Sequence, residues 1–218
     1  MASPKRIPKS LQLELLSYSR SGAKKELAAL QNWLSTKTNF AEVADALPQF
    51  FSRRNFCGAI GGAYGQQMFN PDRIAFELSL GGNYFPDIVI GDSQQKSLLL
   101  VELEGAETDA VFLKKKQDEQ YPDFSSSFKT GFFQLIDWTN RLKDASPRNL
   151  HDWFTFEPAC MRTLLVVGRN EDVGADPKDQ GRRRLNSLAE MFGPSGNPVF
   201  VVTYDELATI VAAYLSGQ

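Results

Sequence analysis

The spacing of hydrophobic residues predicts helices before residue 55. Apolar side chains recur at helical intervals over residues 10–35, where Gly22 is expected to divide the run into two helices. A second helical pattern covers about 40–54. The next run, CGAIGGAYGQQ, is rich in glycine but lacks the Lys-Ser/Thr pair and the preceding strand of a phosphate-binding loop, so we expect a connecting loop.

From residue 74 the pattern changes to strands that alternate with helices. IAFELSL, FPDIVIG and SLLLVELEG are strand-like, as are RTLLVVG at 162–168 and PVFVVTY at 198–204. Helical patterns cover 125–143, with a serine at 125–127 as N-cap, 180–192, and the segment after Thr203. Strands that are apolar on both sides, separated by helices, predict an α/β fold: a mixed β-sheet core flanked by helices.

Acidic residues interrupt two of these strands in the segment FPDIVIGDSQQKSLLLVELE. Glu102 and Glu104 are two residues apart, so they share one face of their strand. A hairpin symmetric about residues 94–95 places Asp87 opposite Glu102, and Phe85 opposite Glu104. Because two facing carboxylates repel each other, this register predicts a cation between Asp87 and Glu102.

Carboxylate ligands with no histidine or cysteine nearby suit Mg²⁺ or Mn²⁺. Such an ion can position a water and stabilise charge on a phosphate. In the alternative interpretation, Asp87 caps the turn while Glu102 and Glu104 face solvent at a sheet edge.

The helix at 125–143 adds polar residues to this picture. Gln134, Asp137 and Arg141 lie on one stripe of it, with Trp138 at the border. If this helix packs beside the acidic strand, Gln134 can orient a water or a phosphate. A solvent-facing role for Gln134 fits the spacing as well.

Composition removes several other classes of function. The net charge is −2, and the chain has two distant cysteines, Cys57 and Cys160, and one histidine, His151, in a stretch that reads as irregular. We therefore do not expect a disulfide scaffold, a zinc module or a multi-histidine site. We expect the protein to reside in a reducing cytoplasm. We see no run long enough to span a membrane and no signal peptide, so we expect a soluble protein.

Together these residues resemble a known family. Pro86-Asp87 followed by the strand ending Glu102-Leu103-Glu104 is similar to the core of PD-(D/E)xK nucleases. The motifs GFFQLIDW, LLVVGR at 164–169 and VVTYDEL at 201–207 narrow this to the Shedu family of prokaryotic anti-phage defence proteins, specifically its C-terminal nuclease-like domain. The similarity runs from about residue 74 to about 215.

The resemblance implies a restriction-endonuclease-like fold, with a helical N-terminal region over 1–55 and a nuclease-like domain over 56–218. It implies a DNA endonuclease that depends on Mg²⁺ or Mn²⁺ and acts as a homo-oligomer, a dimer or tetramer. Carried over by position, Asp87 and Glu102 are metal ligands, and Asp87, Glu102, Glu104 and Gln134 form the catalytic set.

One position departs from the motif: Glu104 stands where the family pattern usually has lysine. A carboxylate there can bind metal or act as a base, but it supplies no positive charge. The substitute cations considered are Arg141 and the lysines Lys114, Lys115 and Lys116. Arg169 either approaches the acidic site or pairs with Glu171 or Asp172.

DNA binding also requires positive surface. The candidates are Lys114, Lys115, Lys116, Arg182, Arg183, Arg184, Arg53 and Arg54. A solvated loop and an amphipathic helix explain the two longer runs equally well.

Because of the missing lysine, an alternative function stays open: a catalytically weakened module with the nuclease fold that binds DNA or a protein partner. A third is an assembly or sensor protein dominated by residues 1–55.

Overall fold

A single sheet is the frame of this fold, and its strands lie in the order of the sequence. The computed structural model describes residues 9–82, 84–114, 121–174, 179–192 and 199–217. The strands of the sheet are β1 (Glu14–Leu15), β2 (Arg73–Phe76), β3 (Ile88–Asp92), β4 (Ser97–Leu103), β5 (Cys160–Val166) and β6 (Val199–Val202). The helices are α1 (Arg20–Thr36), the π-helix η1 (Glu42–Ala46), α2 (Leu47–Phe51), α3 (Arg54–Tyr64), α4 (Ser126–Lys143), α5 (Pro147–Phe154), α6 (Asn170–Val173), α7 (Gln180–Phe192) and α8 (Tyr204–Ser216).

The sheet is mixed, as the sequence predicts. Strands β1 to β4 run antiparallel to their neighbours, whereas β4, β5 and β6 are parallel. Parallel neighbours require long crossovers, which here contain α4 and α5 between β4 and β5, and α6 and α7 between β5 and β6. The mixed α/β prediction is confirmed, and the restriction-endonuclease-like fold stays a prediction.

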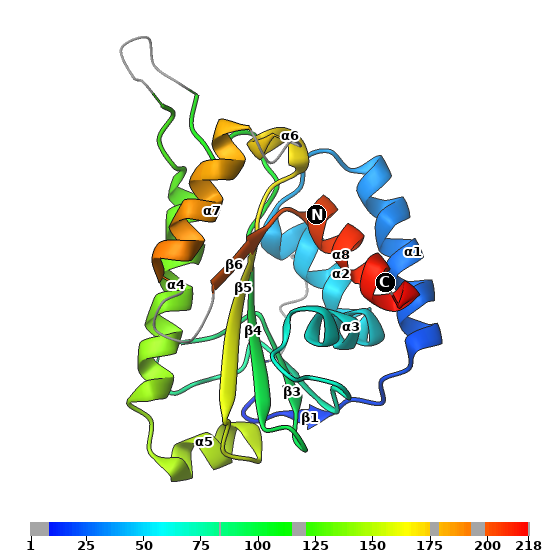
Figure 1. The fold of residues 1–218 in the computed structure, drawn as a ribbon, viewed down its shortest axis with the longest axis vertical. Helices are drawn as coiled ribbons and strands as arrows, with labels where there is room; N and C mark the ends of the chain where they lie inside the picture. Colours follow the sequence, from blue (N-terminus) through cyan, green and yellow to red (C-terminus); the bar gives the residue numbers. More distant parts are fainter. Residues whose placement is uncertain (1–8, 83, 115–120, 175–178, 193–198, 218) are drawn as a thin grey trace.

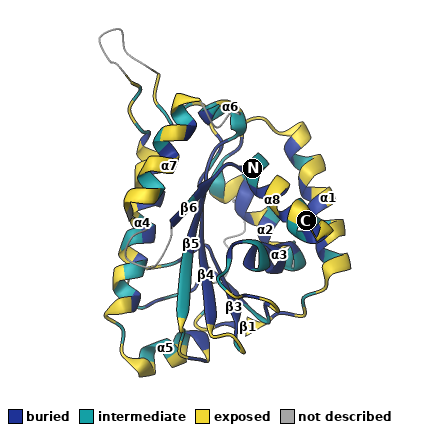
Figure 2. Ribbon diagram, viewed as in Figure 1, coloured by how far each residue is buried: buried dark blue, intermediate teal, exposed yellow. Residues whose placement is uncertain are grey.

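Helices cover both faces of the sheet (Figure 1). α4 and α7 lie on one face, and α1, α3 and α8 on the other. Alternate residues of β4 enter separate hydrophobic cores: Leu99, Val101 and Leu103 face α3 and α8, while Leu98 and Leu100 face α4. Both faces of β4 are therefore buried, and Figure 2 shows the central strands in the buried colour.

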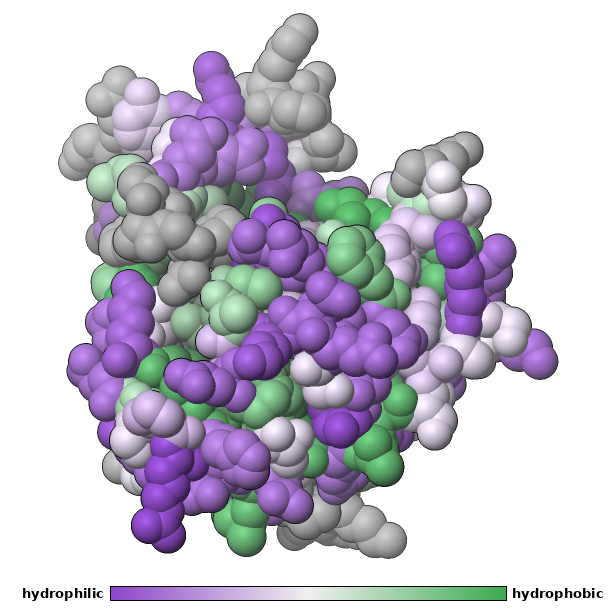
Figure 3. Space-filling view, turned by 60° about the horizontal axis from the view of Figure 1, so that its bottom comes forward, coloured by the Kyte–Doolittle hydropathy of each residue, from purple (hydrophilic) through white to green (hydrophobic). Residues whose placement is uncertain are grey.

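The outer surface is mixed in character. On the face drawn in Figure 3, hydrophilic residues dominate and hydrophobic residues form smaller groups between them. Within the described ranges, no helix is long and apolar enough to cross a membrane.

The N-terminal helical prediction is only partly right. Gly22 does not break a helix; it lies in the first turn of α1, where its N–H donates to the N-cap Ser19 Oγ at 3.1 Å. A side chain at Gly22 would collide with this cap, since its Cβ would lie 2.7 Å from Ser19 Oγ. The residues before Ser19 include β1 rather than a helix, and the pattern at 40–54 resolves into η1 and α2.

The glycine-rich segment predicted as a loop is helix α3, so that prediction is wrong. Its glycines serve close packing: a Cβ at Gly58 would lie 2.6 Å from the Tyr18 ring, and one at Gly61 would lie 2.6 Å from Ile90. Glycine lowers helix propensity by about 1 kcal/mol. Here burial of the helix against the sheet outweighs that cost.

The later helices follow their predictions more closely. Ser125 caps α4 by accepting from Phe128 N–H, and Thr203 and Glu206 form a capping box at the start of α8. α7 covers the predicted 180–192. His151, expected in an irregular stretch, is an exposed residue of α5.

The division at residue 55 stays a prediction, although residues before it belong to the sheet and to its core. β1 pairs with β2, and Leu27, Leu30 and Leu34 of α1 share one hydrophobic cluster with α8.

Arg169 joins three separate elements at the end of β5. Its guanidinium forms a bidentate ion pair with Asp205, at 2.9 and 2.7 Å, and donates to the carbonyls of Leu34 and Lys37 at 3.0 and 2.6 Å. Neither alternative considered for Arg169 describes this arrangement, because its side chain reaches across to Asp205 at the start of α8.

Arg169→Ala is expected to lower the free energy of unfolding by about 2–4 kcal/mol, because it removes the cationic partner of Asp205, which then keeps backbone donors such as the Asn170 N–H, and the donors to two carbonyls. Chemical denaturation measures this loss. The matched control is Arg148→Ala. Within the described residues Arg148 makes an exposed ion pair with Asp152 at 3.9 Å, so this variant should lose less than about 0.5 kcal/mol. Equal losses in the two variants would contradict the role assigned to Arg169.

Candidate functional site

The β3–β4 hairpin has the predicted register. Ile88 pairs with Val101, and the remaining pairs follow as far as Asp92 and Ser97. Extending the register by one residue places Asp87 opposite Glu102. The backbone ladder does not extend to Phe85 and Glu104: its pairs begin at Ile88 and Val101, and the Leu103 N–H donates to the Asp87 side chain instead of to a backbone carbonyl.

Asp87, Glu102 and Glu104 are all buried, at 7%, 5% and 7% exposure. Glu102 and Glu104 point to the α4 face of the sheet, opposite to Val101 and Leu103. The alternative in which these glutamates face solvent at an edge is therefore wrong, and the turn-capping role belongs to a different residue.

That residue is Asp92, which shows how the fold satisfies a structural buried carboxylate. Asp92 is 1% exposed and accepts hydrogen bonds from four backbone N–H groups at 2.9–3.2 Å, those of Phe69, Asn70, Gln94 and Gln95. The Asp87 side chain has one backbone donor, the N–H of Leu103, at 2.8 Å. Glu102 Oε2 is buried without a hydrogen-bond partner in the described part of the chain.

Burial and neighbouring negative charge favour the protonated forms of this pair. Burial first, and then the charge of Glu42, raise the pKa of Asp87 well above its usual range. Burial and then Asp87 do the same to the pKa of Glu102. The hydrogen bond between the two side chains lowers the pKa of Asp87 and raises that of Glu102, although burial keeps both pKa values above their usual range.

Glu104 lies between the sheet and α4. Its carboxyl group packs against Gly131, where a Cβ would lie 2.8 Å from Glu104 Oε1. Its carbonyl accepts from the buried hydroxyl of Tyr204 at 2.7 Å. Burial and then Glu42 raise the pKa of Glu104 to about 8, while a hydrogen bond from the Gly131 backbone lowers it in part.

Two further acidic residues belong to this cluster, and sequence reasoning missed both. Burial and then the charge of Glu77 raise the pKa of Glu42. Glu77 adopts a left-handed backbone (φ 45°), donates its N–H to the Asp87 carbonyl at 2.9 Å, and has a buried Oε2. Glu77 could have been found from the sequence, because it is a carboxylate inside the apolar, strand-like run IAFELSL. Glu42 carried no such signal, because η1 brings it to the site from a distant part of the chain.

A cavity of about 570 Å³ leads to the cluster, with Glu42, Glu104, Glu107 and Asp109 in its wall. The N-terminal serines of α4, Ser125 to Ser127, line its other side. An acidic wall of this kind attracts cations.

Gln134 is half-buried on α4, three residues after Gly131 and so on the same side of the helix. Gln134, the fourth member of the predicted catalytic set, thus lies about one helical turn after Gly131, the residue that contacts Glu104. Arg141 lies further along α4, donates to the Leu80 carbonyl at 3.1 Å and stacks over Trp153, so its charge is already engaged.

The basic candidates are scattered. Lys114 and Arg183 are exposed, and Lys115 and Lys116 lie outside the described residues. Arg182 is buried (7% exposed) and pairs with Glu206 at 2.6 Å, so this side chain is not presented to a phosphate. Arg54 pairs with Glu14, and Arg53 donates to Gln49.

The donor chemistry of the cluster fits a hard divalent cation, because its side-chain donors are carboxyl oxygens, and two of them, Glu77 Oε2 and Glu102 Oε2, are buried without a hydrogen-bond partner in the described residues. Asp87 and Glu102 are the side chains that would hold it. Over the described ranges, no three or more His, Cys, Asp or Glu side chains form a metal-binding group as they stand. The candidate ligand set is therefore the Asp87–Glu102 pair rather than a complete cage.

The fold and site define a mixed α/β protein with a buried acidic cluster on one strand hairpin and a cavity leading to it. The family of the Shedu protein SduA, C-terminal, matches residues 24–208, and the chain belongs to this family. The match begins well before residue 74, so it includes α1 to α3 as well as the sheet. Membership of this family suggests a role in anti-phage defence. A search of curated proteins gives no match.

Glu104→Gln is expected to change how stability depends on pH in the presence of a chelator. The pKa of Glu104 is raised from 4.5 to about 8, so the folded state binds the extra proton and stability falls as pH rises between these values. The glutamine variant lacks this loss. Between pH 5 and pH 8 its free energy of unfolding should therefore rise on the order of 1 kcal/mol relative to that of wild type, after allowance for solvent screening.

Thermal unfolding at the two pH values measures this gain. Glu107→Gln is the control, since Glu107 is an exposed carboxylate at the same cavity. Parallel pH profiles for Glu104→Gln and wild type would show that Glu104 is not a buried, protonated group.

Proposed function

We propose that this protein is a DNA endonuclease that nicks or cleaves phosphodiester bonds with the help of Mg²⁺ or Mn²⁺, and that it acts in the cytoplasm as a homo-oligomer during anti-phage defence. The proposal rests on the Asp87–Glu102 pair: two buried carboxyls that face each other, one with an oxygen that has no hydrogen-bond partner in the described residues. Asp92 is buried too, yet it has four backbone donors.

Asp87 and Glu102 are the proposed metal ligands. A bound divalent cation supplies the positive charge that stabilises ionised carboxylates and the charge that develops on a phosphate during hydrolysis. The Glu102 Oε2 atom, which has no hydrogen-bond partner in the described residues, is the oxygen that such a cation would satisfy. A structural pair would instead be expected to have donors on every buried oxygen.

Glu104 takes a different role from the lysine of the usual motif. A carboxyl with a pKa of about 8 lies in the range where a general base exchanges protons near neutral pH, so Glu104 can accept the proton of an attacking water. Gln134, on the same side of α4 as Gly131, would in this proposal orient that water or a phosphate oxygen.

The departure at Glu104 also favours a second candidate, a catalytically weakened module that binds DNA or a protein partner. The largest influences on the pKa values of Asp87, Glu102 and Glu104 are burial and other carboxyls, and Arg141 is engaged elsewhere. Arg141 therefore does not supply positive charge at the reacting phosphate in the described structure, and a bound metal would supply it.

Supercoiled plasmid incubated with the wild-type protein and Mg²⁺ or Mn²⁺ is expected to become nicked or linear. Glu102→Gln should lose at least about a hundredfold in rate, because it removes a ligand charge while keeping the shape of the side chain. Glu107→Gln, an exposed neighbour of the same charge type, should cleave like wild type.

Equal cleavage by wild type and Glu102→Gln would show that this pair is not the site. DNA binding without cleavage in either metal would favour the binding module.

A further inference from the structure

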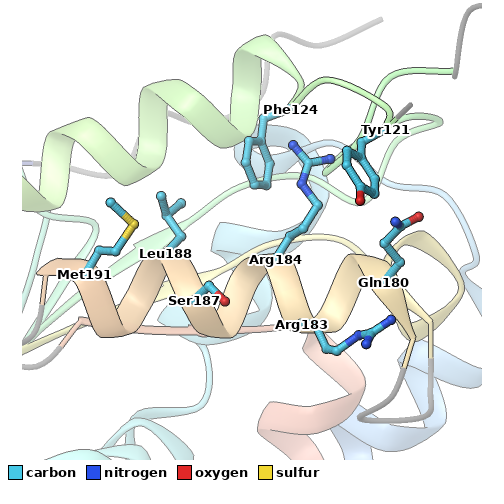
Figure 4. Close-up of a pocket in the computed structure, with 8 residues that line it drawn as sticks. All are labelled: Tyr121, Phe124, Gln180, Arg183, Arg184, Ser187, Leu188 and Met191. Atoms are coloured by element: carbon cyan, nitrogen blue, oxygen red, sulfur yellow. The ribbon is translucent and has the colours of Figure 1, made fainter. Parts of the chain in front are cut away.

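A second cavity, of about 460 Å³, lies along α7 and shares no lining residue with the acidic cavity. Figure 4 shows its walls: one side of α7, together with Tyr121 and Phe124 from the segment before α4. We call it the α7 groove. Its lining residues are Tyr121, Phe124, Gln180, Arg183, Arg184, Ser187, Leu188 and Met191.

The contribution of α7 is one continuous stripe. Its six lining residues fall at i, i+3, i+4, i+7, i+8 and i+11, a pattern that places them on one side of a helix. Two of them are arginines and none is acidic, so the groove has positive character in a protein whose net charge is −2.

Arg184 forms a fixed wall of the groove. Its guanidinium lies 4.6 Å from the ring centre of Phe124 and 5.9 Å from that of Tyr121, and it donates to the Pro122 carbonyl. Phe124 continues into a stacked series, with ring centres 5.0 Å from Phe112 and 4.6 Å from Phe128. The buried end of this series joins the core, so the wall is held in place before any ligand arrives.

The remaining groups offer the chemistry that a nucleotide needs. Tyr121 and Met191 leave apolar surface in contact with solvent, at 43% and 73% exposure, against which a flat ring can stack. Exposed Arg183 can pair with a phosphate, and Gln180 and Ser187 carry donors and acceptors suited to the edge of a base. The volume lies within the range of small-ligand sites.

We propose that the α7 groove binds an unpaired nucleotide, with the base against Tyr121 and the phosphate on Arg183. The nucleotide is either free in solution or part of a single strand. This goes beyond the proposed cleavage, because binding in the groove requires neither a metal nor the acidic cluster.

Binding is measured on the whole protein in chelator, so that no metal-dependent cleavage takes place. Calorimetry with AMP tests the free nucleotide. Fluorescence anisotropy with a labelled ten-nucleotide oligo-dA, alone and as a duplex, tests the strand. If the protein binds AMP but not oligo-dA, the ligand is a free nucleotide. If it binds single-stranded oligo-dA more tightly than AMP, the ligand is part of a single strand. Both outcomes support the proposal.

Ser187→Glu places a negative charge in the groove and is expected to weaken nucleotide binding at least about fivefold. Asn186→Glu is the matched control. It adds the same charge to the residue just before Ser187, which is exposed and does not line the groove. Its nucleotide affinity should stay within about twofold of wild type. Tyr121→Ala should weaken binding about tenfold or more, and Tyr121→Phe should retain it.

Three results would overturn the proposal: no binding of AMP or oligo-dA by wild type, equal effects of Ser187→Glu and Asn186→Glu, or binding of duplex alone that no groove variant changes. Glu102→Gln separates this proposal from the nuclease proposal, because it should bind nucleotide like wild type even if cleavage is never observed.

Discussion

The arrangement of this protein depends on one electrostatic constraint: several carboxyl groups are buried together, and among the described residues their largest electrostatic influences are other carboxyls. Moving a lone carboxylate out of water is costly, and such a group either becomes protonated or acquires a positive partner. Here burial and mutual repulsion raise the pKa values of Asp87, Glu102 and Glu104. Protonation therefore stabilises the buried cluster, and its oxygens are suited to exchange protons for a divalent cation.

The rest of the fold holds this cluster in place from several directions. Gly131 lets α4 approach Glu104 closely, and Tyr204 at the start of α8 fixes the Glu104 carbonyl from the opposite helical layer. Arg169 ties the end of β5 to α8 and α1. The carboxyls therefore sit on rigid strands between two packed layers, which is how a site is kept preorganised.

The sequence predicted the strand hairpin well because its signals are local. Apolar strands around a polar turn determine the register, and the register brings Asp87 to Glu102. The glycine-rich α3 was missed because its stability comes from close packing against Tyr18 and Ile90, which no local pattern reveals. Glu42 was missed for the same reason, since only the tertiary fold carries η1 to the acidic cluster. The partners of Arg169 and Arg141 were likewise set by elements distant in sequence.

A crystal soaked in Mn²⁺ tests the central claim most directly. The anomalous scattering of manganese locates the ion without reference to activity. The account predicts a peak within coordination distance, about 2.2 Å, of carboxyl oxygens from both Asp87 and Glu102. The peak should be absent from crystals of the Glu102→Gln variant soaked in the same way. A peak elsewhere, or none at this pair in wild type, would contradict the claim that these buried carboxyls form a cation site.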